Sequence, residues 1–426
     1  MALLPLSLLI LTTRCSAFDP CNVYAERRPD RREPFALEKL NIAVIFGGPS
    51  QEHDVSVVSA QQLMDAADIR IMNIVPVYMS FEGRFFHGPA LRRLERYRPN
   101  PPGLREVFFD WDDQGACVRA RDGGWRCGVD CALPVFHGPF GEDGRIQGML
   151  EIIGIPTTGF SATNSAIAMR KDATKSLVKS VGVNVLPHVA VHANQLWNAR
   201  SICEEIEARL SFPVVVKPAN LGSSIGVGLA RDRDALMVHL QGALREDTFA
   251  LVEPQVQHLE ELNIAVMHRN GEILFSAIER PKSSAELLDF REKYLSQAGN
   301  GSGEGQGKLG ATIVPSQGML SLTRDINPEL DEGLKSRLYD YAAKAFSILG
   351  IRGAPRMDFM FNKSSGELWF NEINPIPGSY GFFLWEAADP QVLFPDLISH
   401  LVGEALSDSV KEFDDPVPQA ACLLPR

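Results

Sequence analysis

The sequence lacks a disulfide framework, a membrane span and an excess of positive charge. Its seven cysteines are scattered, odd in number and include no CxxC pair, which favours reduced thiols. No apolar run is long enough to cross a bilayer as a helix. The net charge of −11 argues against nucleic acid as the main partner, so an anionic substrate would need local positive residues.

The first forty residues are set aside from the fold because their pattern is ambiguous. Residues 1–13 are largely apolar, but no Lys or Arg precedes them as in a signal peptide. Residues 16–18, followed by the Arg-rich stretch 27–32, resemble two-part plastid presequences, although the stretch is more acidic than a transit peptide usually is. A disordered leader and a misassigned start are further alternatives. We expect a cytoplasmic location, with a plastid as the alternative.

The rest of the chain predicts an α/β fold. Residues 42–46 and 71–78 have the pattern of strands on either side of a helix that Ser50 caps and that runs to about Ala67. Such a βαβ unit predicts a parallel sheet. The other expected helices are 147–153, 164–181 and 330–350, and the other expected strands are 133–136, 212–217, 227–230, 251–256 and 262–268.

Asp358, Glu372 and Asn374 are expected on two neighbouring strands. The strand 356–361 carries Asp358, a turn follows at 362–366, and the strand 367–374 carries the other two. Residues two apart on a strand point the same way, so Glu372 and Asn374 share a face. Two carboxylates and an amide oxygen suit Mg²⁺, which is often shared with substrate phosphates. A hairpin with a few solvated acids fits this pattern equally well.

Two glycine-bearing segments predict contacts between backbone amides and a ligand. Residues 137–144 follow a strand, and their glycines let amides approach closely. Lys217 ends a strand, where a lysine can meet a phosphate as a point charge. The Gly/Ser loop 221–226 adds hydroxyls and amides. The alternatives are a tight turn with a satisfied His137, a surface lysine and an ordinary loop.

Together these residues resemble the ATP-grasp superfamily and, within it, the D-alanine–D-alanine ligase family. Four motifs, at 46–56, 137–144, 217–226 and 371–374, follow the family's order within residues 41–403. The resemblance implies an ATP-grasp α/β fold, with an N-terminal Rossmann-like parallel-sheet domain and two α+β domains that enclose the nucleotide. The implied divisions are a leader at 1–40, domains at 41–160, 161–250 and 251–405, and a tail at 406–426.

The resemblance also implies how the nucleotide is held. Lys171 and Lys217 would bind the ATP phosphates, and Glu253 would lie near the adenine. Glu261 would bind the ribose, and Glu260 is an alternative because the spacing is one residue longer than usual. Lys293 and Tyr294 would form a mobile pair that closes over the site. The Gly-rich residues 299–310 are either part of this lid or an ordinary surface loop, and their composition fits both equally well.

For the reacting groups, the resemblance implies that Arg356 stabilises the transferring phosphoryl group. Asp358, Glu372 and Asn374 match the metal ligands. Glu52, Ser223 and Tyr294 would lie near the first amino acid, with Glu52 facing its ammonium and His137 near its carboxylate.

The implied activity is that of an ATP-dependent ligase that joins two D-alanines through an acyl phosphate, for peptidoglycan precursor synthesis. The implied cofactors are ATP and Mg²⁺, with Mn²⁺ as an alternative. The expected partners are small molecules, with neither nucleic acid nor membrane among them. A homodimer is one option for the assembly.

The resemblance weakens after Asn374. Phe383 stands where the family has a serine that binds the second substrate's carboxylate. Either Ser379 or Tyr380 replaces that serine, or the pocket takes a different amino acid or amine. Thr157 and Arg170 also depart from the family pattern, where Tyr and Asp are usual. A homologue that binds nucleotide without catalysis is the remaining alternative, and the retained Arg356 and metal set argue against it.

Overall fold

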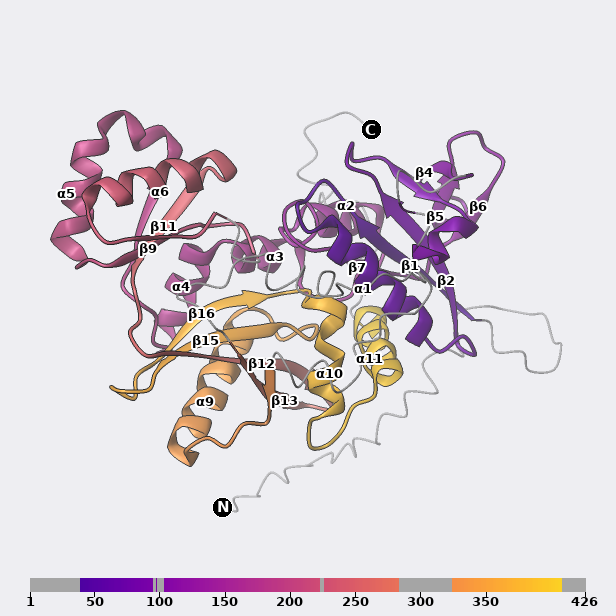
Figure 1. Ribbon diagram of the computed structural model, residues 1–426. Coiled ribbons are helices and arrows are strands. Elements are labelled where there is room, and N and C mark those ends of the chain that lie inside the picture. The colour runs from indigo at the N-terminus through magenta and orange to yellow at the C-terminus, as the bar shows by residue number, and fades with distance from the viewer. Residues whose placement is uncertain (1–38, 95–96, 98–102, 223–225, 283–323, 408–426) are drawn as a thin grey trace, which may run out of the picture. The chain divides into compact units, whose positions relative to one another are not determined.

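Three β-sheets carry the fold in the computed structural model, which describes residues 39–94, 97, 103–222, 226–282 and 324–407 (Figure 1). All of these residues belong to one compact unit, Lys39–Arg426. The finer division into three domains stays a prediction. Within the described residues, no helix is long and apolar enough to span a bilayer.

The first sheet has seven strands in the order β6-β5-β4-β3-β2-β1-β7. Its strands are β1 (Leu40–Gly47), β2 (Met72–Met79), β3 (Phe85–His87), β4 (Arg105–Asp112), β5 (Gly115–Ala120), β6 (Arg126–Gly128) and β7 (Cys131–Val135). The helical elements here are α1 (His53–Ala66), the 3₁₀ turn η2 (Pro89–Arg92) and α2 (Arg145–Ile153).

The predicted βαβ unit is confirmed, because β1 pairs in parallel with both β2 and β7. The remaining neighbours in this sheet are antiparallel. The predicted cap of α1 is wrong. The helix begins after Glu52, and the Ser50 hydroxyl instead accepts a hydrogen bond from the Glu52 N–H at 3.1 Å.

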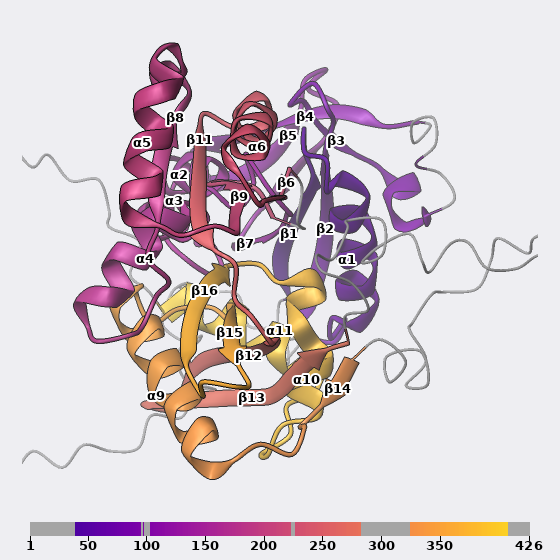
Figure 2. The same cartoon turned by 60° about the vertical axis from the view of Figure 1, so that its left-hand side comes forward.

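The second sheet has four antiparallel strands in the order β10-β9-β11-β8. These are β8 (Val189–His192), β9 (Val214–Pro218), β10 (Gly228–Ala230) and β11 (Phe249–Pro254). The hairpin predicted around the Gly/Ser loop is present as β9 and β10. The helical elements that accompany the sheet are η4 (Ala193–Asn198), α5 (Ala199–Arg209) and α6 (Arg233–Glu246) (Figure 2).

The helix predicted at 164–181 is two helices, α3 (Ala162–Met169) and α4 (Lys171–Ser180). Arg170 between them has an extended backbone. Its guanidinium stacks on Phe249 at 3.7 Å and pairs with Asp172 at 2.9 Å. The Lys171 N–H donates to Ala219 O at 3.1 Å. These tertiary contacts compensate for the break, which helical periodicity alone does not reveal.

The third sheet has five antiparallel strands in the order β14-β13-β12-β15-β16. They are β12 (Leu259–Arg269), β13 (Glu272–Pro281), β14 (Arg324–Ile326), β15 (Arg356–Asn362) and β16 (Leu368–Asn374). The remaining helical elements are α9 (Glu332–Ile348), the 3₁₀ turn η5 (Gly378–Gly381), α10 (Phe382–Glu386) and α11 (Phe394–Ser407).

The third sheet has one apolar and one polar face, as period-two alternation requires. Leu262, Ile264 and Met357 belong to a buried cluster that includes α9 residues. Cross-strand partners project to the same face, so Glu261, opposite Met360, lies on the face that carries Asp358. This sheet therefore presents a row of polar side chains away from α9.

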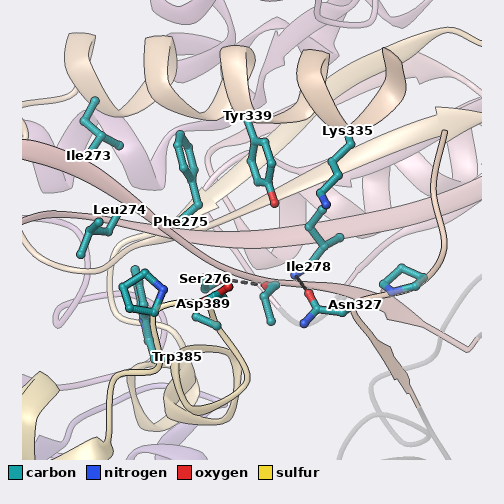
Figure 3. Close-up of a pocket in the computed structure, with 14 residues that line it drawn as sticks. Ile273, Leu274, Phe275, Ser276, Ile278, Asn327, Lys335, Tyr339, Trp385 and Asp389 are labelled. Atoms are coloured by element: carbon teal, nitrogen blue, oxygen red, sulfur yellow. Dashed lines mark hydrogen bonds between the residues drawn. The ribbon is translucent and has the colours of Figure 1, made fainter. Parts of the chain in front are cut away.

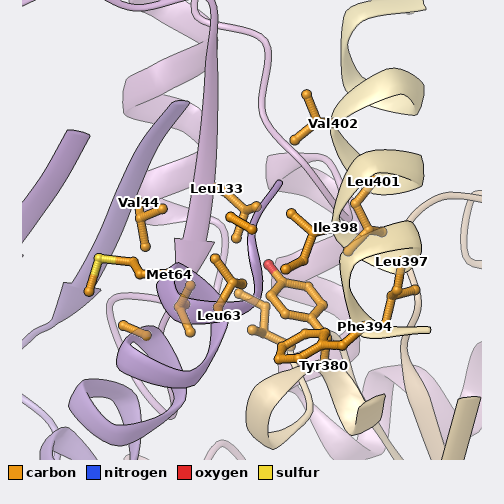
Figure 4. Packing of buried hydrophobic residues seen from close by; sticks show 14 of the residues in the cluster. Val44, Leu63, Met64, Leu133, Tyr380, Phe394, Leu397, Ile398, Leu401 and Val402 are labelled. Carbon is orange, nitrogen blue, oxygen red and sulfur yellow. The ribbon is translucent and has the colours of Figure 1, made fainter. Parts of the chain in front are cut away.

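A second apolar cluster joins the two ends of the described chain (Figure 4). It packs Val44 of β1, Leu63 of α1 and Leu133 of β7 against Tyr380 and helix α11. The Tyr380 hydroxyl also donates to Pro134 O at 2.6 Å. The segment that follows the metal-binding pattern is thereby fixed against the first sheet.

Candidate functional site

The predicted metal ligands meet on β15 and β16. Asp358 lies directly opposite Glu372, and Arg356 lies opposite Asn374. The Asn374 Nδ2 donates to Asp358 Oδ2 at 3.1 Å. The strand pair and turn predicted from the sequence are confirmed, and they bring two carboxylates and an amide into one patch.

A β-bulge shifts the register within this patch. Between the pairs Asp358–Glu372 and Phe359–Phe370, β16 has one extra residue, Asn371. The bulge interrupts the strict alternation of side chains. As a result both Asn371 and its neighbour Glu372 contact lysines.

Cations already contact these acids. Arg356 donates from Nε and Nη2 to the two oxygens of Asp358 at 2.7 and 2.8 Å. Lys171 Nζ lies 3.2 Å from Glu372 Oε2 and donates to Leu221 O at 2.6 Å. Charge-assisted pairs of this kind hold the side chains in fixed positions.

The donor chemistry of Asp358, Glu372 and Asn374 fits a hard divalent cation, because it consists of carboxylate and amide oxygens. A metal ion bound there would share these acids with Arg356 and Lys171. In the part of the chain that the structure describes, no group of three or more His, Cys, Asp and Glu side chains is arranged to hold a metal. A metal ion here would therefore need further oxygens besides the two carboxylates, from the Asn374 amide, water or substrate.

A second charged cluster lies between the second and third sheets. Lys217 Nζ lies 2.6 Å from Glu253 Oε2, and Lys175 Nζ lies 2.8 Å from Glu253 Oε1. Burial raises the pKa of Glu253, but the two lysine charges outweigh it and lower that pKa to about 2. Glu253 is therefore ionised at neutral pH and bridges β11, β9 and α4.

The geometry distinguishes Glu261 from its alternative, Glu260. Glu261 projects to the face that carries Asp358, whereas Glu260, its neighbour on the strand, projects to the other. Glu260 also lies 3.8 Å from both Arg280 and Lys363. Of the two, Glu261 is the one placed to contact a ligand on the polar face.

Glu52 lies where the other two glycine-bearing segments meet. A Cβ atom on Gly138 would lie 2.9 Å from Glu52 Oε2 and 2.5 Å from Ser50 Oγ. A Cβ atom on Gly222 would lie 3.3 Å from the same Glu52 oxygen. A side chain at position 138 would force Ser50 or Glu52 to move, and Gly138 also has a positive φ of 83°. The structure thus joins the 137–144 motif to the start of the Gly/Ser loop through one carboxylate.

His137 is buried and neutral. Burial, with a smaller contribution from the charge of Arg356, lowers its pKa to about 4. Its Nε2 lies 3.1 Å from Ser59 Oγ, which also accepts a hydrogen bond from the Ser379 N–H at 3.1 Å. His137 is therefore linked to the segment just beyond the predicted metal ligands.

Glu142 makes a second link of this kind. Its Oε2 accepts from the Gly138 N–H at 2.7 Å, and its Oε1 accepts from the Ile376 N–H at 3.3 Å. Burial, followed by the negative charge of Glu52, raises its pKa to about 8. Glu142 thus holds a proton at neutral pH and ties the 137–144 motif to residue 376.

The three residues considered for the second-substrate end have different surroundings. Tyr380 is fully buried, and its hydroxyl is bonded to Pro134. Phe383 lies on α10, partly buried, with the guanidinium of Arg324 4.9 Å from its ring centre. Ser379 donates from its hydroxyl to Gln62 and belongs to the His137–Ser59 network. Ser379 and Tyr380 are therefore both buried, and each hydroxyl already has a hydrogen-bond partner.

Some predicted site residues lie outside the described residues. These are Ser223, Lys293 and Tyr294, together with the segment 299–310. Their assigned roles stay predictions.

A hollow of about 490 Å³ lies elsewhere, between β13, α9 and the end of α10 (Figure 3). Tyr339 and Lys335 face it from α9, and Ser276 and Trp385 line it from below in this view. It contains none of the predicted site residues. The clustered charges at β15, β16 and α4 are the stronger sign of a functional site.

Sequence reasoning missed three residues of the site. Glu142 lies within the motif at 137–144, which gives this residue no role of its own. Lys175 lies one helical turn after Lys171, and complete burial of a lysine leaves no signal in the sequence. Asn371 was included in a motif, but its contact with Lys217 depends on the bulge.

Comparison with known proteins gives a consistent result. Family models described as "D-ala D-ala ligase N-terminus" and "D-ala D-ala ligase C-terminus" match residues 41–160 and residues 177–308 and 319–403. A D-alanine–D-alanine ligase of Thermosipho melanesiensis is 31% identical over 370 residues, which cover 86% of this chain and 94% of that protein.

Two solved structures are also similar. The D-alanine–D-alanine ligase of Coxiella burnetii has a TM-score of 0.69 at 24% identity, and the match covers 87% of this chain and 94% of that one. The VanG D-Ala:D-Ser ligase of Enterococcus faecalis has a TM-score of 0.68 at 25% identity, and the match covers 86% of this chain and all of that one.

Proposed function

Because this chain belongs to the D-alanine–D-alanine ligase family, we propose that it joins two D-alanines in an ATP-dependent reaction that supplies peptidoglycan precursors. The α/β fold of the ATP-grasp type agrees with the prediction from the sequence. The observation that carries the proposal is the meeting of Lys171 and Lys217 with the oxygen-rich strand β16.

The nucleotide end is proposed from these contacts. The family uses ATP and a divalent metal, and Mg²⁺ is the metal that we propose, with Mn²⁺ as an alternative. The metal would be held by Asp358, Glu372 and Asn374. When bound, a divalent cation neutralises part of the phosphate charge. Lys171 and Lys217 would hold phosphate oxygens, since both already point at the acidic patch.

Two further acids complete the proposed nucleotide end. Glu253 would lie near the adenine, because it is on β11 where the second sheet leads into the third. Glu261 would bind the ribose from the polar face of β12. Lys293 would belong to the closing pair with Tyr294, on the family resemblance alone.

Arg356 is proposed to stabilise the transferring phosphoryl group. The carboxylate of the first D-alanine attacks the γ-phosphorus of ATP, the bond to the β-phosphate breaks, and ADP leaves as the acyl phosphate forms. The amine of the second D-alanine then attacks the acyl carbonyl, loses a proton and displaces inorganic phosphate. Negative charge develops on the phosphoryl oxygens during the first step, and a fixed guanidinium offsets it. The two bonds to Asp358 hold Arg356 in one orientation.

The amino-acid end is proposed around Glu52. Its carboxylate, which lies beside Gly138 and Gly222, would face the ammonium of the first D-alanine, with Ser223 and Tyr294 completing this contact. His137 is neutral, so it would act as a hydrogen-bonding group near the substrate carboxylate and not as a cation.

Release of ADP that depends on D-alanine tests the proposal. Purified protein with ATP and Mg²⁺ is expected to release ADP only when a D-amino acid is present. Folded protein that releases no ADP with any D-amino acid would refute ligase activity and would favour a nucleotide-binding homologue without catalysis.

A second candidate function is a ligase that adds a different amino acid or amine to D-alanine. Phe383 and Arg324 occupy the neighbourhood of the expected serine, and one similar solved structure is a D-Ala:D-Ser ligase. A screen of second substrates at fixed D-alanine, with the products identified by mass spectrometry, separates the two. A mixed product made in preference to the D-alanine dimer would favour the second candidate.

Assembly and location stay proposals. A homodimer is the assembly that we propose, and sedimentation at several protein concentrations would test it. The choice between cytoplasm and plastid depends on residues 1–38, which lie outside the described residues.

A further inference from the structure

Lys175, Glu253 and Lys217 form a buried line of charges. Lys175 is fully buried, and Glu253 and Lys217 are 2% and 8% exposed. The carboxylate lies between the two ammonium groups, 2.8 Å from Lys175 and 2.6 Å from Lys217. Each oxygen of Glu253 thus has a cation of its own.

The two lysines differ in their remaining contacts. Lys175 Nζ donates to the Phe370 backbone carbonyl at 3.3 Å, inside the protein. Lys217 Nζ donates to Asn371 Oδ1 at 2.9 Å, next to Glu372. Lys175 is therefore confined to the interior, whereas Lys217 lies at the border of the proposed phosphate site.

A lysine that binds a phosphate has to share or exchange its existing partners. If Lys217 turns from Glu253 toward a phosphate, Glu253 remains as a buried anion. A buried charge that loses its only partner is strongly destabilising. A second, permanent cation beside Glu253 removes most of that penalty.

We propose that Lys175 is a positioning residue, the fixed counter-ion that keeps Glu253 neutralised while Lys217 exchanges Glu253 for a phosphate of ATP. This inference rests on the proposed function, in which Lys217 binds phosphate. Lys175 touches no substrate and acts through Glu253. Without it, the carboxylate would retain Lys217 and compete with the nucleotide.

Nucleotide binding to the full-length protein tests this role. Lys175→Met keeps the length of the side chain but removes the charge. Lys179→Met is the matched control, since Lys179 is exposed near the end of the same helix. Calorimetry would measure the affinities of a non-hydrolysable ATP analogue with Mg²⁺ and of adenosine, which has no phosphate.

Lys175→Met is expected to lower the affinity for the ATP analogue by more than about tenfold and the affinity for adenosine by less than about threefold. Lys179→Met should change neither. Equal losses for the two ligands would overturn the inference, because a merely structural role would not distinguish them. A wild-type protein that binds no ATP analogue would instead overturn the proposed function and this inference with it.

A second comparison covers the case in which Lys175→Met does not fold. Adding Lys175→Met to Glu253→Gln removes both charges of the pair, so no carboxylate remains to retain Lys217. The double variant should bind the ATP analogue within about threefold of Glu253→Gln alone, or better. A larger loss would show that Lys175 contributes something other than neutralisation of Glu253 and would refute the proposal.

Discussion

Asn371 Oδ1 accepts a hydrogen bond from Lys217 Nζ at 2.9 Å, although 154 positions separate the two residues in the chain. The bond joins the end of β9 in the second sheet to the bulge of β16 in the third. One residue further along β16, Glu372 meets Lys171 of α4 at 3.2 Å. Two adjacent side chains thus receive one cation each, and the first predictions concern this junction.

Glu372→Gln should abolish most of the ligase activity. The change keeps the side-chain shape but removes a carboxylate that we assign to the metal and that already pairs with Lys171. D-alanine-dependent ADP release is expected to fall by at least about a hundredfold. Glu367→Gln, an exposed position just before the same strand, is the control and should retain activity. Unchanged turnover in Glu372→Gln would mean that the activity arises elsewhere.

Metal and nucleotide should stabilise the protein together. Arg356 and Lys171 already neutralise Asp358 and Glu372, so Mg²⁺ alone should shift the melting temperature little. Mg²⁺ with a non-hydrolysable ATP analogue should raise the melting temperature by several degrees. At a ligand concentration of 100 times Kd, binding adds about 2.7 kcal/mol to the free energy of unfolding. Thermal unfolding with chelator, metal, analogue and both ligands measures this. A full shift with Mg²⁺ alone would contradict the shared use of these acids.

Gly138→Ala should disable the amino-acid end. The new methyl group would lie 2.5 Å from Ser50 Oγ and 2.9 Å from Glu52 Oε2, so Glu52 would have to move. We expect a large rise in the KM for D-alanine and a loss of stability. Gly159→Ala is the matched control, because Gly159 has the same φ of 83° but no atom of the described chain beyond its immediate neighbours lies within 4 Å of the place where its Cβ would stand. The Gly159→Ala variant should lose only about 1–2 kcal/mol of stability, which is the cost of a left-handed backbone for a residue other than glycine. Equal effects of the two changes would refute the placement of Glu52.

Glu142 should make stability fall as pH rises. Its pKa is raised from 4.5 to about 8, so between these values the folded chain keeps a proton that the unfolded chain has released. The contribution of Glu142 to the free energy of unfolding is complete below about pH 4.5 and decreases as the pH rises to about 8, by at most about 1.4 kcal/mol per pH unit. Glu142→Gln is the reference protein, because its side chain cannot titrate.

Denaturant unfolding from pH 5 to 8 measures the effect as the stability of the wild type minus that of Glu142→Gln. This difference should decrease as pH rises, and the opposite contribution of His137 cancels because both proteins carry it. Glu367→Gln, with its exposed side chain, should give a curve parallel to that of the wild type. A constant difference between wild type and Glu142→Gln would show that Glu142 is ionised throughout.

The sequence was informative wherever a local pattern decides the structure. The alternation in 356–374 predicted the two strands and the shared face of Glu372 and Asn374. The apolar run and glycines at 42–48 predicted a strand followed by a turn. In each case the period of the side chains or the conformational freedom of glycine is a property of the segment itself.

The remaining features depend on contacts between distant segments. The break at Arg170 is compensated by stacking on Phe249, 79 positions away, and neither residue predicts it alone. The bulge at Asn371 leaves no mark in its own sequence. Lys175 is on a helix whose pattern would suit an exposed lysine, and its burial is tolerated because Glu253 of the second sheet and the Phe370 carbonyl of the third contact its ammonium group. Tertiary context decided each of these positions.

The two faces of the first sheet differ in when they can form during synthesis. One face packs only residues from the first 155 positions, such as Ile45, Val77 and Leu150. The other face, beside Val44 and Leu133, is covered by Tyr380 and α11. Those covering residues are synthesised long after the strands that they cover. Apart from the part that α1 covers, this apolar face of the nascent chain must therefore stay exposed until α11 has been made, and exposed apolar surface of this kind favours aggregation.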